Sequence, residues 1–203
     1  MIRDSKTICL LVFLVLVFSF SPVFASNQSP KQCVAELLGM IQKIKPEDKL
    51  PAEQKKANRT LSEKALSHLN VSAISQKALG KFWSERTDKE KEQFSQLLSE
   101  LFIYVAFPNS GKFFADLDWV YAEPEIEKGK ALVPIKLTHK DEGEIEIDFF
   151  LQQNSSDWKV VDVHLDGVSM GNNLRNQFYK IIGKDNFAEL VSRMKKKLDE
   201  SKV

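Results

Sequence analysis

The chain of 203 residues has few cysteines, histidines and glycines, and almost no net charge. Its two cysteines are Cys9, in an N-terminal segment that we expect to be removed, and Cys33, so an internal disulfide and a cysteine-ligated metal site are excluded. We expect Cys33 to be a small buried residue of the first helix rather than a reactive thiol. The formal net charge of +1 argues against a nucleic-acid partner, because a phosphate-binding surface needs a large basic excess. No glycine-rich phosphate loop and no Gly-x-Ser-x-Gly elbow is present.

The chain also lacks an apolar run long enough to cross a bilayer. The run from Thr7 to Phe20 covers about 14 residues, whereas a spanning helix needs roughly 20. Basic residues precede it, and Val23-Phe24-Ala25 supplies the small or apolar residues of a cleavage site before Ser26. We therefore expect residues 1–25 to be a signal peptide and residues 26–203 to form a single exported, soluble domain. An uncleaved N-terminal anchor is the alternative.

Helical periodicity marks both ends of the mature chain. The clearest helix begins at a capping box of Thr87 and Glu90 and carries apolar residues at i, i+3, i+4, i+7 and i+8. Proline cannot continue the hydrogen-bond ladder, so this helix is expected to stop at Phe107-Pro108. The charged stretch 45–59 is expected to be a loop that holds at most the start of the next helix. In all the pattern predicts about five to six helices, the others at residues 29–44, 61–69, 71–82, 169–183 and 185–198.

From Asp118 the period of apolar residues changes from 3.6 to two. Alternation predicts four strands, at residues 119–126, 131–138, 144–152 and 158–166. Their short polar connections require antiparallel neighbours, so the strands form a four-stranded antiparallel meander. Pro134 inside the second strand indicates an edge position or a bulge. One sheet covered by amphipathic helices makes an α+β fold.

The best enzyme-like constellation is Asp162, His164 and Asp166, which share one face of the fourth strand. A histidine between two carboxylates suits a general base or a metal site. The opposite face carries Val161 and Val163, so we expect the polar trio to lie on a solvated outer face of the sheet. No His-x-x-x-His spacing occurs, and no metal site is predicted.

Two segments resemble a known family. The strand-to-helix stretch Asp157–Met170 with Asn172–Phe178, and the earlier stretch Leu69–Trp83, resemble the MlaC (toluene-tolerance, Mla-type) family of periplasmic phospholipid-binding proteins. The resemblance spans roughly Leu61 to the C-terminus. It implies a curved antiparallel sheet and helices that enclose a deep apolar cavity, similar to the NTF2-like cone. It also implies a periplasmic protein that is not an enzyme and has no cofactor, with bound phospholipid as its cargo.

The same resemblance implies partners on both membranes. They are an inner-membrane Mla-type ABC transporter complex with an MCE subunit and an outer-membrane lipoprotein–porin complex, between which a monomeric carrier shuttles lipid and maintains outer-membrane lipid asymmetry. Three alternatives stay open. One is a hopanoid-linked carrier of the same fold, and another is an interaction module whose apolar face seals against a partner. The third is an NTF2-like isomerase-type enzyme for a small apolar substrate, with its acid and tyrosine drawn from Tyr104, Tyr121, Asp148 and Asp162.

Apolar side chains of the strands and of neighbouring helices are the candidates to line the pocket implied by the resemblance. They are Phe82, Tyr104, Val133, Ile135, Ile147, Phe149, Leu151, Val161, Val163, Leu165, Met170, Leu174 and Phe178. Arg175 is the candidate near the headgroup phosphate, or it supports the strand–helix corner. The same stripes also suit a closed core, so the sequence leaves open whether this face lines a cavity.

Overall fold

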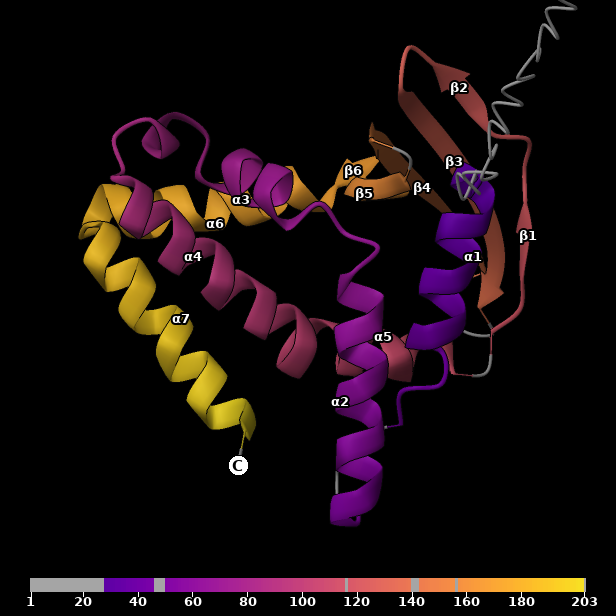
Figure 1. Ribbon diagram of the computed structural model, residues 1–203, viewed down its shortest axis with the longest axis horizontal. Helices are drawn as coiled ribbons and strands as arrows, with labels where there is room; N and C mark the ends of the chain where they lie inside the picture. The colour runs from indigo at the N-terminus through magenta and orange to yellow at the C-terminus, as the bar shows by residue number, and fades with distance from the viewer. Residues whose placement is uncertain (1–27, 46–49, 116, 140–142, 156, 203) are drawn as a thin grey trace, which may run out of the picture.

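The computed structural model describes residues 28–45, 50–115, 117–139, 143–155 and 157–202 (Figure 1). The expected signal peptide and its cleavage site lie outside these residues. Among the described residues no helix is both long and apolar enough to cross a membrane.

The helices form six stretches in the described part of the chain, as the period predicted. α4 (Asp88–Leu101), the π-helical turn η2 (Phe102–Ala106) and α5 (Phe107–Phe114) follow one another without a break. The remaining stretches are α1 (Pro30–Ile41), α2 (Ala52–Leu66), α3 (Val71–Leu79) with the 3-10 turn η1 (Gly80–Trp83), α6 (Met170–Lys184) and α7 (Phe187–Lys202).

Two helix boundaries differ from the prediction. The capping box of Thr87 and Glu90 is confirmed, but Pro108 does not end the helix. In η2 the Phe107 N–H donates to the Phe102 carbonyl five residues back, so Pro108 enters as a first-turn residue of α5 where no N–H is needed. The loop expected up to residue 59 is also wrong, because α2 begins at Ala52.

A tertiary contact explains why α2 forms without a strong apolar stripe. The side chain of Asn58 is buried, donates to the Lys45 carbonyl at 2.8 Å and accepts from the Lys45 N–H at 3.0 Å. This pair fixes α2 against the chain that leaves α1. The helix is therefore stabilised by one buried polar contact that hydrophobic periodicity does not register.

The sheet has six strands, so the predicted four-stranded meander is too small. Its order is β1 (Trp119–Tyr121), β3 (Lys130–His139), β4 (Gly143–Asn154), β5 (Asp157–Leu165) and β6 (Val168–Ser169), and β2 (Glu125–Glu127) also pairs with β3. All the paired strands are antiparallel. The predicted first strand is split into β1 and β2, with Pro124, which cannot donate to a ladder, between them. β6 is a two-residue addition that leads into α6.

Pro134 lies in β3, which is an inner strand. Its carbonyl accepts a hydrogen bond from the Ala122 N–H at 3.0 Å, at the place where β1 has ended and β2 has not begun. The missing N–H of Pro134 therefore points to the gap between two edge strands, and the ladder with β4 stays complete through the Pro134–Asp148 pair. Pro134 was expected on an edge strand or at a bulge; the structure instead places it on an inner strand, where its unpaired side faces the gap between β1 and β2.

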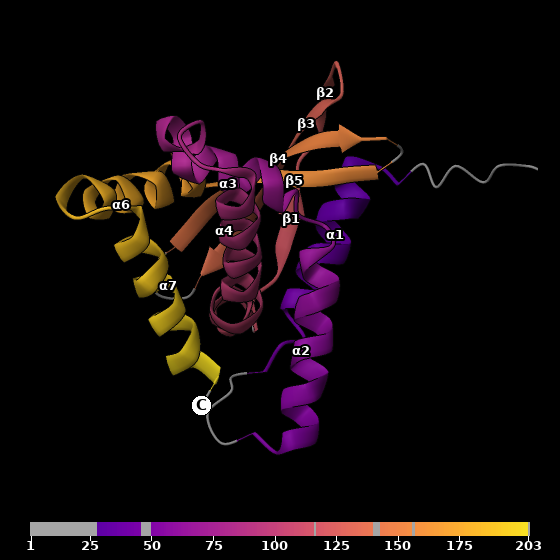
Figure 2. The ribbon, with the colours of Figure 1, turned by 60° about the vertical axis from the view of Figure 1, so that its left-hand side comes forward.

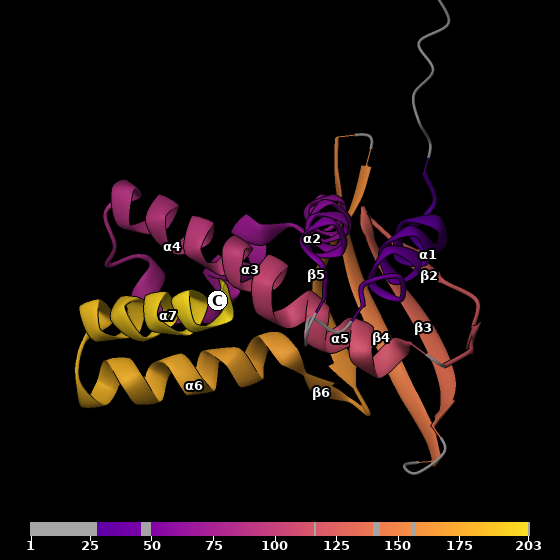
Figure 3. The same cartoon turned by 90° about the horizontal axis from the view of Figure 1, so that it is seen from below.

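The polypeptide packs as two lobes, each with its own core. The sheet lobe comprises the sheet with α1, α2 and α5, and the helical lobe comprises α3, α4, α6 and α7. Figures 2 and 3 show the helical lobe standing beside the β5 edge of the sheet. Leu69 and Phe102 are partly buried and pack against both cores, and η2 contacts helices of both lobes. The boundary between the cores, which we call the seam, positions the site described below.

Candidate functional site

An apolar cleft of about 290 Å³ lies on the seam. One wall is β5, from Val160 to Val163, and the other is formed by Ile74 of α3 and the first two turns of α6. Leu69 and Phe102 close its floor between the two cores, and its exposed rim carries Asn173 and Gln177 of α6. The cleft is the place where the apolar surfaces of both lobes meet without full closure.

Four of the candidate lipid-contacting residues line this cleft. They are Val161, Val163, Met170 and Leu174, all from the strand-to-helix segment Asp157–Phe178. The structure adds lining residues that the sequence did not single out: Leu69, Ile74, Phe102 and Val160. Phe102 was visible as part of the apolar stripe of its helix, but the stripe has no feature that separates a cleft residue from a core residue.

Five candidates from the sheet lie instead in the closed core of the sheet lobe. Each is at most 4% exposed, and the five are Val133, Ile135, Ile147, Phe149 and Leu151. Helices α1 and α5 cover this face, so these side chains contact protein on all sides. A ligand would reach them only if the cleft deepened along the seam.

The remaining candidates are dispersed over the helical lobe and the surface. Phe178 is buried against the Phe94 ring in the helical core, with ring centroids 5.8 Å apart, and Phe82 packs edge-on against Tyr179. Leu165 is 37% exposed at the end of β5. Tyr104 lies on the opposite side of η2 from the cleft, in a basic groove treated below.

Arg175 is directed to the corner between α3 and η1. Its Cδ lies 3.0 Å from where a Cβ on Gly80 would be, and it is not among the residues that line the cleft. This contact is at a different corner from the strand–helix corner that the sequence suggested, so a role of Arg175 near the headgroup or at that corner stays a prediction.

Asp162 is the polar centre of the site and is not the solvated residue that alternation predicted. It pairs with Phe150 across the sheet, but Lys77 of α3 and the start of α6 cover it, and its side chain is only 4% exposed. The Oδ1 atom accepts from the Gly171 N–H at 2.9 Å. The Oδ2 atom accepts from the Ser169 hydroxyl at 2.6 Å and from the Lys77 ammonium of α3. We call these contacts the Asp162 network.

The Asp162 network joins three elements at the cleft. Burial alone would raise the pKa of the Asp162 carboxyl, but the hydrogen bonds from Lys77, Ser169 and Gly171 outweigh it and hold this pKa below its ordinary value. The ionised carboxylate also faces the N-terminus of α6, where a negative charge is stabilised. His164 Nε2 lies 3.1 Å from Oδ2, and its ring packs against that of Phe150, with centroids 4.2 Å apart and the planes tilted by 42°. The oxygens of Asp162 are thus used for holding β5, α3 and α6 together.

A second cluster looks like a catalytic triad but has the wrong protonation for one. Cys33 Sγ lies 3.6 Å from His68 Nδ1, and His68 Nε2 lies 3.8 Å from a carboxylate oxygen of Glu36. Burial raises the pKa of the Cys33 thiol to about 11 and lowers the pKa of His68, so both groups are neutral at pH 7. The thiol donates to the Trp158 carbonyl at 3.1 Å. Cys33 therefore has the buried structural position expected from the sequence, and it is not a nucleophile.

No group of three or more histidine, cysteine, aspartate or glutamate side chains is placed to hold a metal ion in the parts of the chain that the structure describes. The tyrosine and carboxylate candidates for an isomerase are also separated by the fold. Tyr104 is in the basic groove, Asp162 is enclosed by its network, and Asp148 pairs with Pro134 in the sheet.

Comparison with known proteins agrees with this description. The MlaC protein family matches residues 32–196. A search of curated proteins gave no match. One similar solved structure is the phospholipid-binding protein from Ralstonia solanacearum in complex with a phospholipid; it has a TM-score of 0.65 and 16% sequence identity, over 85% of this chain and 96% of that one. Because the family match covers most of the sequence, the chain belongs to the MlaC family.

Proposed function

We propose that this protein binds a phospholipid through its acyl chains and carries it across the periplasm. The observation that carries the proposal is the apolar cleft on the seam, where two separately packed cores meet. Membership of the MlaC family supports it, and so does the similarity in fold to a protein described as phospholipid-binding.

The energetics of lipid transfer require a protein of this kind. Two acyl chains contain on the order of 30 methylene groups, each worth about 0.8 kcal/mol when it leaves water. Roughly 24 kcal/mol therefore opposes the release of a diacyl lipid into water, and unassisted diffusion between membranes is negligible. In an apolar site of a soluble protein the acyl chains have nearly the same free energy as in the bilayer interior, so the free-energy change of transfer is close to zero. No covalent chemistry is needed, which agrees with the protonation of Cys33 and His68.

The dimensions of the cleft imply that the lobes separate when lipid enters. Ligand pockets for small molecules span about 300–1,000 Å³, and this cleft of about 290 Å³ is at the lower limit, too small for two acyl chains. Leu69 and Phe102 lie at its floor and contact both cores. Displacing these two partly buried side chains would open the boundary between the cores, at the loss of their own contacts with each.

We also propose the location and the partners that the resemblance implied. The N-terminal segment would direct export, and the mature carrier would exchange lipid with an inner-membrane Mla-type ABC transporter complex and an outer-membrane lipoprotein–porin complex, in support of outer-membrane asymmetry. N-terminal sequencing of the protein from a periplasmic extract should give Ser26 as the first residue. An intact Met1 in the membrane fraction would contradict export as a cleaved, soluble protein.

Native mass spectrometry of the full-length protein, expressed in a Gram-negative host and purified from the periplasm, tests the function directly. We expect a complex with a single diacyl phospholipid and weak preference among headgroups, because most lining residues of the cleft are apolar and the Asp162 carboxylate is bound within its own network. A protein free of lipid would contradict the carrier and favour an interaction module. A hopanoid in the extracted lipid would identify the protein as a hopanoid-linked carrier of the same fold.

A further inference from the structure

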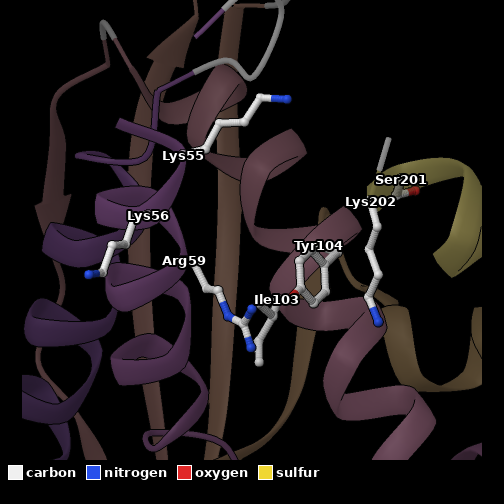
Figure 4. Close-up of a pocket in the computed structure, with 7 residues that line it drawn as sticks. All are labelled: Lys55, Lys56, Arg59, Ile103, Tyr104, Ser201 and Lys202. Atoms are coloured by element: carbon white, nitrogen blue, oxygen red, sulfur yellow. The ribbon is translucent and has the colours of Figure 1, made fainter. Parts of the chain in front are cut away.

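A groove of about 390 Å³ on the far side of η2 from the apolar cleft is lined mainly by cations (Figure 4). We call it the basic groove. Helix α2 supplies Lys55, Lys56 and Arg59, and the last turn of α7 supplies Lys202. Tyr104 of η2 lies between the two helices at its base. No carboxylate is among the lining residues.

Two of these cations are held in place around the tyrosine ring. The Arg59 guanidinium lies 5.5 Å and the Lys202 ammonium 4.9 Å from the centroid of Tyr104, a cation–π geometry on both sides. Arg59 is also bonded to Glu63 at 2.9 Å and Lys202 to Glu100 at 2.6 Å. These hydrogen bonds raise the pKa of each cation, so both keep their charge well above neutral pH. Each carboxylate uses one contact to hold its cation, and neither carboxylate is among the residues that line the groove.

Lys55 and Lys56 add charge that is not compensated locally. Both are exposed, and neither forms an ion pair among the described residues. Four cations therefore border one concave surface of a chain whose formal net charge is only +1. Such a concentration of positive charge raises the local concentration of anions even when the whole protein is close to neutral.

We infer that the basic groove is a binding site for a phosphate group, of the kind that a phospholipid headgroup carries. Guanidinium and ammonium groups are the side chains that bind phosphate oxygens in proteins, and the Tyr104 hydroxyl is a further donor at the base of the groove. Its lining, four cations among seven residues, suits a headgroup phosphate rather than acyl chains.

The arrangement differs from an ordinary solvated row of lysines, such as Lys195, Lys196 and Lys197 on α7. The cations of the groove come from helices of different lobes, α2 in the sheet lobe and α7 in the helical lobe, and η2 contacts both. A phosphate bound by Arg59 and Lys202 would bridge the lobes on the side of η2 opposite the apolar cleft. Bound phosphate would therefore stabilise the arrangement of the two lobes in which Arg59 and Lys202 can both contact one anion.

This role rests on the proposed lipid-carrier function, because a lipid carrier meets phosphate groups whenever it approaches a membrane or its cargo. The π turn η2 is common to both sites, since Phe102 faces the apolar cleft and Tyr104 faces the groove. Lobe separation at the cleft and phosphate contact at the groove thus act on one five-residue turn.

Titration of the full-length mature protein with inorganic phosphate, followed by NMR, tests the site. Sodium chloride at matched ionic strength is the reference. We expect saturable shifts confined to α2, η2 and α7, and a dissociation constant that rises about fivefold to tenfold in Arg59→Gln and in Lys202→Gln. Arg193→Gln is the matched control, because Arg193 also pairs with a glutamate four residues away and lies outside the groove. Its dissociation constant should equal that of the wild type.

A second arm identifies the source of the phosphate. The protein is sedimented with vesicles of phosphatidylglycerol and phosphatidylcholine. If vesicle binding weakens in Arg59→Gln but not in Arg193→Gln, the groove binds lipid headgroups. If the protein binds phosphate but not vesicles, the groove binds the free ion. Absence of a saturable shift, or equal loss in Arg59→Gln and Arg193→Gln, overturns the site. Native mass spectrometry keeps the two proposals apart, because Arg59→Gln should retain its cargo lipid if the acyl chains occupy the cleft.

Discussion

Replacing Val163 by arginine is the sharpest test of whether the apolar cleft receives acyl chains. Val163 lies in the wall of the cleft, partly buried, at the pair with Phe149 in the sheet. An arginine there can extend its guanidinium to the rim near Asn173 and Gln177, so the cost is the lost apolar contact, about 1 kcal/mol. The bound lipid, by contrast, would meet a charge in the wall of its site.

Replacing Leu151 by arginine should instead unfold the protein, and it shows what an arginine in the closed core does. Leu151 is 2% exposed in the sheet core. Losing its burial costs about 1.5–3 kcal/mol, and enclosing an unpaired charge adds several more. The sum, about 5 kcal/mol or more, is comparable with the entire stability of a typical domain, so Leu151→Arg should fail to fold.

Thermal melts combined with lipid quantitation by mass spectrometry separate the cases. Val163→Arg should melt within a few degrees of the wild type and carry almost no lipid. Val120→Arg is the control, since Val120 is 73% exposed on edge strand β1 and should change neither property. A folded Val163→Arg protein with its full complement of lipid would refute the assignment of this wall to the acyl chains. If Val163→Arg unfolds like Leu151→Arg, the cleft belongs to the closed core.

Three further predictions follow from polar and glycine positions. The ionised Asp162 carboxylate stabilises the folded protein above its ordinary pKa, near 3.8, and this stabilisation is lost as the pH falls through the lower pKa of the folded state. Denaturant titrations should therefore show Asp162→Asn to be about 2–4 kcal/mol less stable than the wild type at pH 7. This difference in stability should shrink below about pH 4. A deficit that is constant with pH would contradict this. Gly80 has a φ of +48° and faces the Tyr179 hydroxyl, so Gly80→Ala should cost about 2–4 kcal/mol, whereas Gly39→Ala, in open space on α1, should stabilise by about 0.5–1 kcal/mol. Cys33 is 0% exposed, so in the native protein it should react with a thiol reagent at pH 8 only as fast as the protein opens or unfolds; rapid labelling would contradict its burial.

Local sequence rules predicted the elements well where the deciding contacts are local. The capping box of Thr87 and Glu90 involves residues three apart and is confirmed, and the helix predicted from residue 169 is α6, with Ser169 as its N-cap. The rules were wrong where a distant group decides. Pro108 was read as a helix stop because the π turn before it has no sequence pattern of its own. The start of α2 depends on Asn58 binding the backbone of Lys45.

The candidate site shows the same division. Alternation along β5 placed Val161 and Val163 on an apolar surface, and both line the cleft. Asp162 is covered by Lys77 of α3 and by the start of α6, both outside β5, so the sequence of β5 alone gave no sign that Asp162 would be buried. The apolar stripe of a helix or strand also does not indicate which of the two cores that element packs against. For that reason the residues of the sheet core and those of the cleft had the same appearance in the sequence.

The two-lobe packing has a consequence for how the chain folds. Cys33 on the first helix bonds the carbonyl of Trp158, and α1 packs against β3 and β5, so the sheet lobe is built from contacts between residues more than a hundred positions apart. Contacts of this range form slowly because a long loop must close first. During synthesis the apolar face of α1 therefore stays uncovered until most of the polypeptide has emerged. The sheet lobe therefore cannot be completed before β5 has been synthesised.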